Sequence, residues 1–241
     1  MAVETWLWIG TIGMLLGAVI LYFALVSNKS LRDEGDYQSH FYVPLIAFTL
    51  YLLMALGAGA LVTSTGRVYY FARYIDWSIT TPLLLYSLVT SGLHGTGIKR
   101  PALVVGLLGA DVYMILTGFV AGLSDNPSVK WTFYICSCAA FIAIYGLLFG
   151  PFKKLTATGP HASTYMKKAM FLSAIWFAYP VVFLIGQEGF RIWSATWDAV
   201  FFTLLDLIAK VVYGVWAVSL AKKSAIAEND YSPSVARTAA V

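Results

Sequence analysis

The stretch Phe201–Leu220, FFTLLDLIAKVVYGVWAVSL, is an apolar run long enough to cross a membrane as a helix, yet it contains two charged residues. Asp206 and Lys210 are four residues apart, so both side chains project from one face of a helix. Each charge costs about 2.5–3.5 kcal/mol at the centre of a membrane helix, so an interaction must offset that cost. These two residues alone leave two interpretations open: a structural ion pair, or an amine nucleophile that holds a carbonyl compound as a Schiff base.

The composition of the whole chain is typical of an integral membrane protein. Hydrophobic residues make up 59% and charged residues 12%, with a mean hydropathy of +0.75, whereas about a quarter of the residues in a soluble domain are charged. Apolar stretches of spanning length occur at 5–27, 40–62, 71–92, 101–122, 130–150, 168–187 and 196–221. The sequence therefore predicts an all-α bundle of seven transmembrane helices in one domain, 1–223, and a disordered tail, 224–241.

The basic residues indicate how the bundle is oriented. One set of connections carries Lys29, Arg32, Lys99, Arg100, Lys153, Lys154, Lys167, Lys168, Lys222, Lys223 and Arg237, and the opposite set carries only Arg67, Lys130 and Arg191. By the positive-inside rule the N-terminus is outside and the C-terminus is cytoplasmic, as in a multi-pass protein of the cell (plasma or inner) membrane. The net charge of +4 therefore reflects topology and not a nucleic-acid partner.

A second charged cluster lies in the third predicted span, 71–92. Arg73, Asp76 and Thr80 follow one another at helical spacing and share a face. A hydroxyl one turn from a carboxylate can hydrogen-bond to it, and a neighbouring arginine favours its ionised form. A purely structural Arg–Asp pair, with Thr80 bonded to the helix backbone, is the alternative. Together with Asp206 and Lys210, however, these groups would balance as two acids and two cations around one site.

Aromatic residues near the middle of two spans predict the walls of a slot. Trp77 adjoins Asp76, and Trp176 and Tyr179 are three residues apart, at a depth where an interfacial aromatic belt would not lie. Pro180 removes a backbone donor from the same helix, which membrane helices tolerate where a neighbour or a cavity compensates.

Five strings together resemble one family along nearly the whole chain: VPLIAFTLYLLM (43–54), ARYIDWSITTPLLL (72–85), GADVYMILTG (109–118), SAIWFAYPVVFLIGQEG (173–189) and LLDLIAKV (204–211). The chain is similar to the bacteriorhodopsin-like microbial (type 1) rhodopsins. The resemblance implies seven helices around all-trans retinal, which Lys210 binds as a protonated Schiff base, and a photoreceptor that is not an enzyme.

The resemblance also implies roles for individual residues. Asp76 matches the primary proton acceptor, Asp206 the second counterion, and Arg73 the arginine that moves between the counterions and the outer exit. Tyr51 matches a tyrosine that hydrogen-bonds the aspartate of helix seven, and Asp111 a buried, structural carboxyl. The residues that match the retinal pocket are Trp77, Thr81, Leu84, Met114, Gly118, Trp176 and Tyr179.

Two further acids, Glu188 and Asp198, match the pair that releases protons outside in bacteriorhodopsin. The alternative is that both are ordinary acids of a surface loop.

One position departs from the pattern of outward pumps. Eleven residues after Asp76, about 16 Å along a helix, those pumps carry an acidic proton donor, and this chain has Ser87. A serine cannot donate a proton at neutral pH, so the proton arrives through water or from a substitute donor. His40 is the candidate substitute, because it matches the helix-two position that contacts the donor; capping of its helix at the interface is the alternative.

The remaining motif positions separate the candidate functions. Asp76, Thr80 and Ser87 fit neither chloride nor sodium pumps, and Leu50 replaces the histidine of proteorhodopsin-like members. Ala209 before the lysine is typical of pumps. We expect a light-driven outward proton pump whose partners are protons and the lipid bilayer, compatible with a homo-oligomer. A photosensory rhodopsin that signals to a transducer protein is the first alternative, since such members also lack the acidic donor. A light-independent transporter or channel is the second.

Overall fold

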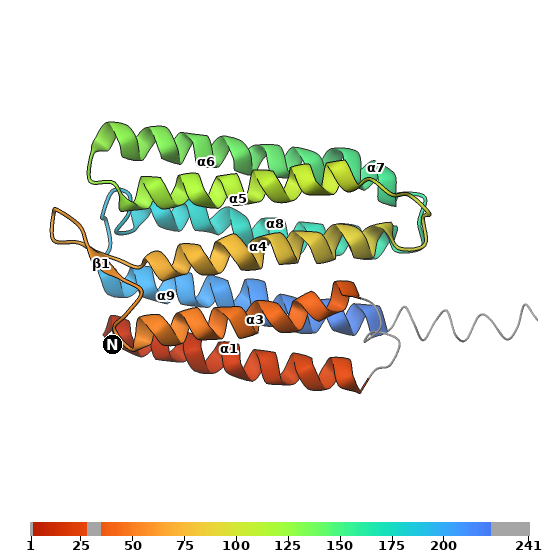
Figure 1. The fold of residues 1–241 in the computed structure, drawn as a ribbon, viewed down its shortest axis with the longest axis horizontal. Helices are drawn as coiled ribbons and strands as arrows, with labels where there is room; N and C mark the ends of the chain where they lie inside the picture. The colour runs from red at the N-terminus through yellow and green to blue at the C-terminus, as the bar shows by residue number, and fades with distance from the viewer. Residues whose placement is uncertain (1, 28–34, 223–241) are drawn as a thin grey trace, which may run out of the picture.

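A computed structural model describes residues 2–27 and 35–222, and within them seven long helices lie side by side (Figure 1). The predicted seven-helix bundle is confirmed. The long helices are α1 (Val3–Val26), α3 (Gly35–Ala55), α4 (Phe71–Leu93), α5 (Pro101–Leu123), α6 (Pro127–Leu147), α8 (Ala162–Ile185) and α9 (Ala195–Asp206). The predicted tail at 224–241 lies outside the described residues.

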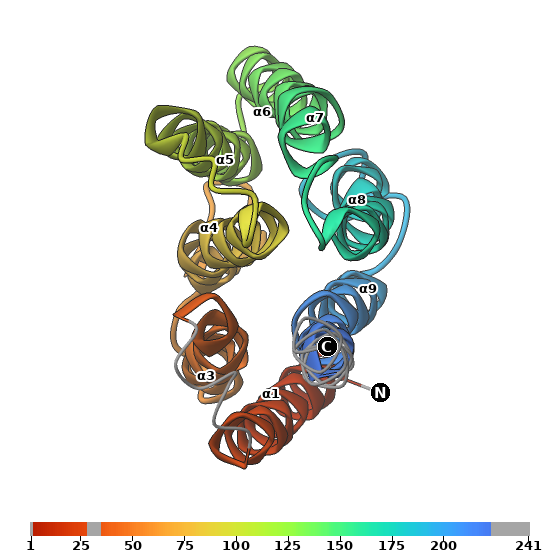
Figure 2. The same cartoon turned by 90° about the vertical axis from the view of Figure 1, so that its right-hand side faces the viewer.

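The helices form a closed ring when the bundle is viewed along its axis (Figure 2). They follow one another in chain order from α1 to α8, and α9 returns to pack against α1. Six helices of the described chain are long and apolar enough to span a membrane, and α4 is not among them. Instead α4 carries buried polar and charged residues, among them Arg73, Asp76 and Thr80, which lower its mean hydropathy.

Local signals in the sequence explain where two helices begin. Proline at the first turn starts both α5, at Pro101, and α6, at Pro127, because its missing N–H needs no partner there. Before α6, the Asn126 side chain also accepts hydrogen bonds from the backbone amides of Ser128 and Val129.

The second span is shorter than predicted. It ends at Ala55 and not near residue 62, because Gly57 and Gly59 adopt positive φ angles of 80° and 73°, which glycine tolerates and which interrupt a helix. Strand β1 (Leu61–Val62) then pairs with β2 (Val68–Tyr69) as an antiparallel hairpin. Leu61 and Val62, which hydropathy assigned to the second span, therefore belong to this hairpin.

The connection between the fifth and sixth spans is also more helical than predicted. After α6 the chain continues through a π-helical turn, η1 (Leu148–Phe152), and a short helix, α7 (Lys153–Thr156), and α8 begins at Ala162. The Tyr165 hydroxyl donates to the Leu148 carbonyl in this turn at 2.8 Å. The two ends of the bundle are thus the hairpin end, which also holds the start of α1, and the α7 end (Figure 1).

The last helix contains a second π-helical turn. After α9, η2 (Leu207–Val212) includes Lys210, and residues 213–222 return to α-helix. Such turns hold one extra residue and are frequent at functional sites.

Candidate functional site

The centre of the bundle is a buried lysine between two carboxylates. Asp76 comes from α4, Asp206 from the end of α9 and Lys210 from η2, and each is at most 2% exposed. The Lys210 amine donates to Asp76 Oδ2 and lies 3.1 Å from Asp206 Oδ1. The two acids and the amine offset the cost of one another's burial, as the sequence required.

The two carboxylates differ in how completely their oxygens are bonded. Asp206 Oδ2 accepts from the Tyr51 hydroxyl at 2.7 Å, and its Oδ1 accepts from Trp77 Nε1 at 3.0 Å and the Tyr179 hydroxyl at 2.8 Å. Asp76 Oδ1, by contrast, is buried and bonds to no group in the part of the chain that the structure describes. Asp206 is therefore held from three helices, whereas Lys210 is the side chain that donates to Asp76 Oδ2.

The contacts of Asp76 within α4 differ in part from those expected. The Thr80 hydroxyl donates to the backbone carbonyl of Asp76 at 2.8 Å, as a threonine that reaches the preceding helical turn does, and it also interacts with the Asp76 carboxyl. Arg73 pairs with acids nearer the hairpin end, since its long side chain extends away from Asp76. Arg73 therefore forms its ion pairs with Glu188 and Asp198, although its charge also acts on Asp206.

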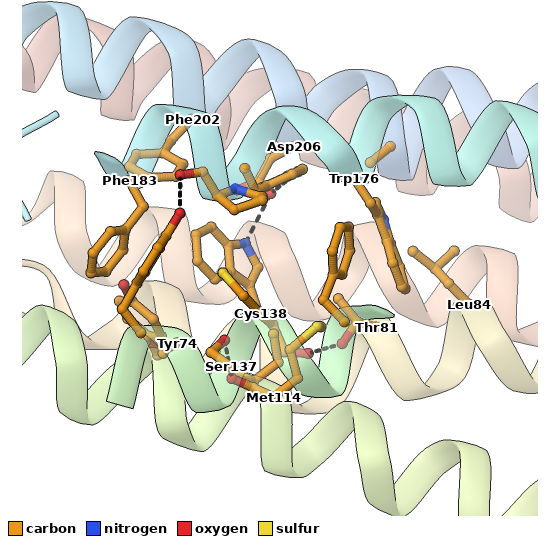
Figure 3. Close-up of a pocket in the computed structure, with 18 of the residues that line it drawn as sticks. Tyr74, Thr81, Leu84, Met114, Ser137, Cys138, Trp176, Phe183, Phe202 and Asp206 are labelled. Carbon is orange, nitrogen blue, oxygen red and sulfur yellow. Dashed lines mark hydrogen bonds between the residues drawn. The ribbon is translucent and has the colours of Figure 1, made fainter. Parts of the chain in front are cut away.

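A slot lined mainly by apolar and aromatic side chains lies beside these charged groups, and its lining includes Lys210 and Asp206. Figure 3 shows Met114, Ser137 and Cys138 on one side, and Trp176 and Asp206 on the other. All seven residues predicted for the pocket line this slot: Trp77, Thr81, Leu84, Met114, Gly118, Trp176 and Tyr179. Tyr51 is not in the lining and reaches the site through its bond to Asp206.

Sequence reasoning did not assign several other lining residues to the slot. The missed lining residues are Tyr74, Ile115, Tyr134, Ser137, Cys138, Phe141, Pro180, Phe183, Phe202 and Ala209. Part of this set carried a signal, since Tyr134, Cys138 and Phe141 share one face of α6 and Phe202 precedes Asp206 by one turn. Cys138 is a free cysteine, as is Cys136.

Asp111, a residue of α5, contacts the slot through Thr81 of α4. The Thr81 hydroxyl donates to Asp111 Oδ2 at 2.6 Å and to the Trp77 carbonyl at 2.8 Å. Asp111 is fully buried on α5, the helix that packs against α4. Its position suits a link between helices.

At the hairpin end, Arg73 lies between two more acids. Arg73 Nη1 is 3.9 Å from Glu188 Oε1 and 3.8 Å from Asp198 Oδ2, and its guanidinium covers the Phe202 ring at 4.1 Å. Both acids are buried, so their assignment to an ordinary surface loop is wrong. A cavity of about 410 Å³ borders Arg73, Glu188 and Asp198.

The loop between α8 and α9 shapes this acidic pair. Asp198 Oδ1 accepts from the Gln187 amide at 3.1 Å, and a side chain at Gly186 would place its Cβ 2.0 Å from that oxygen. Burial, and then the nearby Asp198, raise the pKa of Glu188 from 4.5 to about 7, although Arg73 opposes the shift. Glu188 can therefore hold or lose a proton near neutral pH.

On the other side of the slot, Ser87 and His40 meet. The Ser87 hydroxyl lies 3.1 Å from His40 Nε2, and the two residues are 0% and 1% exposed. His40 is inside α3 and contacts the edge of the Tyr213 ring at 5.7 Å. The alternative that His40 caps a helix at the interface is wrong.

Comparisons with known proteins agree on one family. A family model described as bacteriorhodopsin-like protein matches residues 1–224. The bacteriorhodopsin of Haloterrigena sp. (strain arg-4) is 37% identical over 242 residues, which cover 97% of this chain and 92% of that protein. Among solved structures, the thermophilic rhodopsin of Rubrobacter xylanophilus has a TM-score of 0.83 and 37% identity, covering 90% of this chain and 95% of that one. The light-driven proton pump of Coccomyxa subellipsoidea has a TM-score of 0.81 and 33% identity, covering 90% and 96%.

Proposed function

Because this chain belongs to the bacteriorhodopsin-like family, a group of multi-pass cell-membrane proteins that are not enzymes, we propose that it is a light-driven pump that moves protons outward. One structural neighbour, from Coccomyxa subellipsoidea, is a light-driven proton pump. The observation that carries the proposal is the buried Lys210 amine, which donates to Asp76 and lies 3.1 Å from Asp206, whose oxygens accept from three further side chains.

The slot fits the retinal chromophore that the family implies. An elongated apolar molecule needs an apolar, aromatic lining, and an aldehyde needs a buried amine at one end; the slot has both. Lys210 is the one amine in the lining. When bound, retinal, which we take to be the all-trans isomer, supplies light absorption and a light-driven change of shape that alters the proton affinity of the Lys210 nitrogen.

Asp76 is the proposed acceptor of the proton on the Lys210 nitrogen. The two groups are already hydrogen-bonded, so the transfer needs no large movement. Tyr51, Trp77 and Tyr179 already donate hydrogen bonds to the oxygens of Asp206, which leaves Asp76 as the proposed acceptor.

Release at the hairpin end follows from charge. Once Asp76 is neutral, it attracts Arg73 less, and Arg73 is held more strongly by Glu188 and Asp198. A closer guanidinium favours the ionised carboxylates, so this pair loses a proton toward the cavity that borders it. The hairpin end is the proposed outer face.

The nitrogen then regains a proton from the α7 end. Ser87 cannot supply one, whereas His40, bonded to Ser87, carries a titratable imidazole on that side. Each proton moved against the membrane potential costs about 2.3 kcal/mol per 100 mV, far less than the energy of a visible photon.

The test is to illuminate cells that express the chain with retinal in unbuffered medium. Acidification of the medium that a protonophore abolishes supports the outward pump, and alkalinisation contradicts its direction. A coloured protein that causes no pH change favours the photosensory alternative. A colourless protein removes both, and leaves the light-independent transporter.

A further inference from the structure

A second buried lysine lies in the α7 half of the bundle. Lys168 of α8 is 1% exposed, whereas its neighbour Lys167 is exposed. A lysine at the end of a membrane helix normally extends its amine to water, so full burial of this one is costly. An ionisable group inside a membrane protein is most often functional, and the proposed cycle has not yet used this one.

The Lys168 amine begins a series of polar contacts that leads toward the slot. It donates to the Ser91 hydroxyl at 3.3 Å. Ser91 is four residues after Ser87 on α4, so the two hydroxyls share a helix face. Ser87 in turn bonds to His40. Polar groups from three helices thus follow one another through an otherwise apolar interior.

Titratable side chains near Lys168 include His40, Tyr165 and Tyr213. His40, from α3, is close enough for the charge of Lys168 to act on it. Tyr165 is one turn earlier on α8, and its hydroxyl is bonded to Leu148. Tyr213, from the last helix, stacks on Phe171 of α8 and contacts the edge of the His40 ring.

We propose that Lys168 stores the proton that recharges the Lys210 nitrogen and delivers it through Ser91, Ser87 and His40. The inference rests on the proposed pump. An Nζ–H bond of the ammonium breaks, the proton passes to the hydroxyl and imidazole groups, and the neutral amine takes a new proton from the inner solution. A serine hydroxyl can give up a proton only as it receives another, whereas an amine can store one as an ammonium. The rest of the distance, about 16 Å along α4 from Ser87 to the level of Asp76, requires water.

A donor and a fixed positive charge predict different results for two variants at this position. Lys168→Met removes both the proton and the charge, and Lys168→Arg keeps the charge on a guanidinium that does not give up its proton. Lys167→Met is the matched control. The measurement is the recovery of visible absorption after a flash, between pH 6 and 9, with ordinary dark colour as evidence of folding.

If Lys168 donates, both Lys168 variants recover about tenfold more slowly than the wild type, azide restores the rate, and Lys167→Met is unchanged. If Lys168→Arg recovers at the wild-type rate, Lys168 acts only as a fixed positive charge and the proposal fails. It also fails if both Lys168 variants recover at the wild-type rate. If Lys168→Met is colourless, Ser91→Ala is measured in its place. Slower recovery in Ser91→Ala supports the path from Lys168, and an unchanged rate overturns that path.

A second measurement needs no light. The ¹⁵N resonance of the Lys168 amine, identified by its loss in Lys168→Met or Lys168→Arg, must be that of an ammonium at neutral pH in the dark. A neutral amine there has no proton to give and overturns the proposal. Acidification by the wild type tests the pump separately: if it is absent the pump fails, and if it is present while the Lys168 variants recover normally, only this inference fails.

Discussion

Lys210 supplies the amine of the slot, and its removal is the simplest test at the scale of a single residue. Lys210→Ala should abolish the visible band that forms when retinal is added, because no other lysine lines the slot. Lys167→Ala, which changes an exposed lysine of α8, should leave the band unchanged. A visible band from bound retinal in Lys210→Ala would place the covalent attachment elsewhere.

The carboxylate of Asp76, next to the Lys210 nitrogen, leads to a prediction about colour. A carboxylate beside a positively charged chromophore end holds that charge near the nitrogen, so Asp76→Asn should shift the absorption band to longer wavelength at neutral pH. The same variant should lose outward transport, and acid titration of the wild type should reproduce the shift. If Asp76→Asn kept its colour and still acidified the medium, the acceptor role would pass to Asp206.

Glu188 should make the stability of the protein depend on pH. Its pKa is raised from 4.5 to about 7 in the folded protein, so the folded state binds this proton more tightly than the unfolded chain does. The contribution to stability is therefore fully present below pH 4.5 and is lost as the pH rises through about 7. Glu188→Gln should flatten the thermal unfolding temperature across this window, measured in detergent. Glu4→Gln, at the start of α1, is the control.

At the scale of the helix, the α7 half of α4 determines how fast the site is recharged. With Ser87 in place of an acid, recovery of the visible absorption after a flash should lengthen as the pH rises. Ser87→Asp should shorten it and reduce its dependence on pH. His40→Ala should slow it by about tenfold, with rescue by azide. An unchanged rate in His40→Ala would leave His40 a packing residue, and a wild-type rate that does not depend on pH would exclude direct uptake from the solution and favour an internal donor such as Lys168.

The β1–β2 hairpin is held by one side chain outside it. Asp125, between α5 and α6, accepts from the Ser64 hydroxyl at 2.8 Å and from the Thr65 amide at 3.1 Å. It also pairs with Arg67 at 3.7 Å and with Arg191 at 3.6 Å. Asp125→Ala should therefore raise amide hydrogen exchange in residues 61–69, with little change in the slot. Ser64→Ala, which removes one of these bonds, should have a smaller effect, and equal exchange in all three proteins would show that strand pairing suffices.

Hydropathy predicted the helices but not their ends or irregular turns, and the reason is physical. Burial in lipid constrains an average over some twenty residues, whereas the end of α3 depends on the φ angles of Gly57 and Gly59. The Asp206–Lys210 pair was predictable because its spacing is local. The Tyr51–Asp206 bond joins residues 155 positions apart, and only the family resemblance indicated it.

At the scale of the whole molecule, the charged groups discussed above are distributed between the two ends of the ring. The acids near Arg73 are at the hairpin end, the lysine and its two carboxylates are central, and Lys168 and His40 are toward the α7 end. Pattern reasoning located the central group best, because charge in an apolar run is conspicuous. It missed Lys168 as a site, since this lysine reads in the sequence as part of a basic connection.

The π-helical turn η2 makes the length of the last helix a stricter requirement than its composition. An ordinary helix turns by about 100° per residue, so a residue inserted within 207–212 would rotate everything after it by roughly that angle. Tyr213 would leave Phe171, and Trp216, whose ring centre now lies 5.2 Å from that of Phe171, would move with it. A deletion within 207–212 would instead remove the extra residue of the π-turn and close it as an α-turn, so it would change the position of Lys210 more than that of the residues that follow.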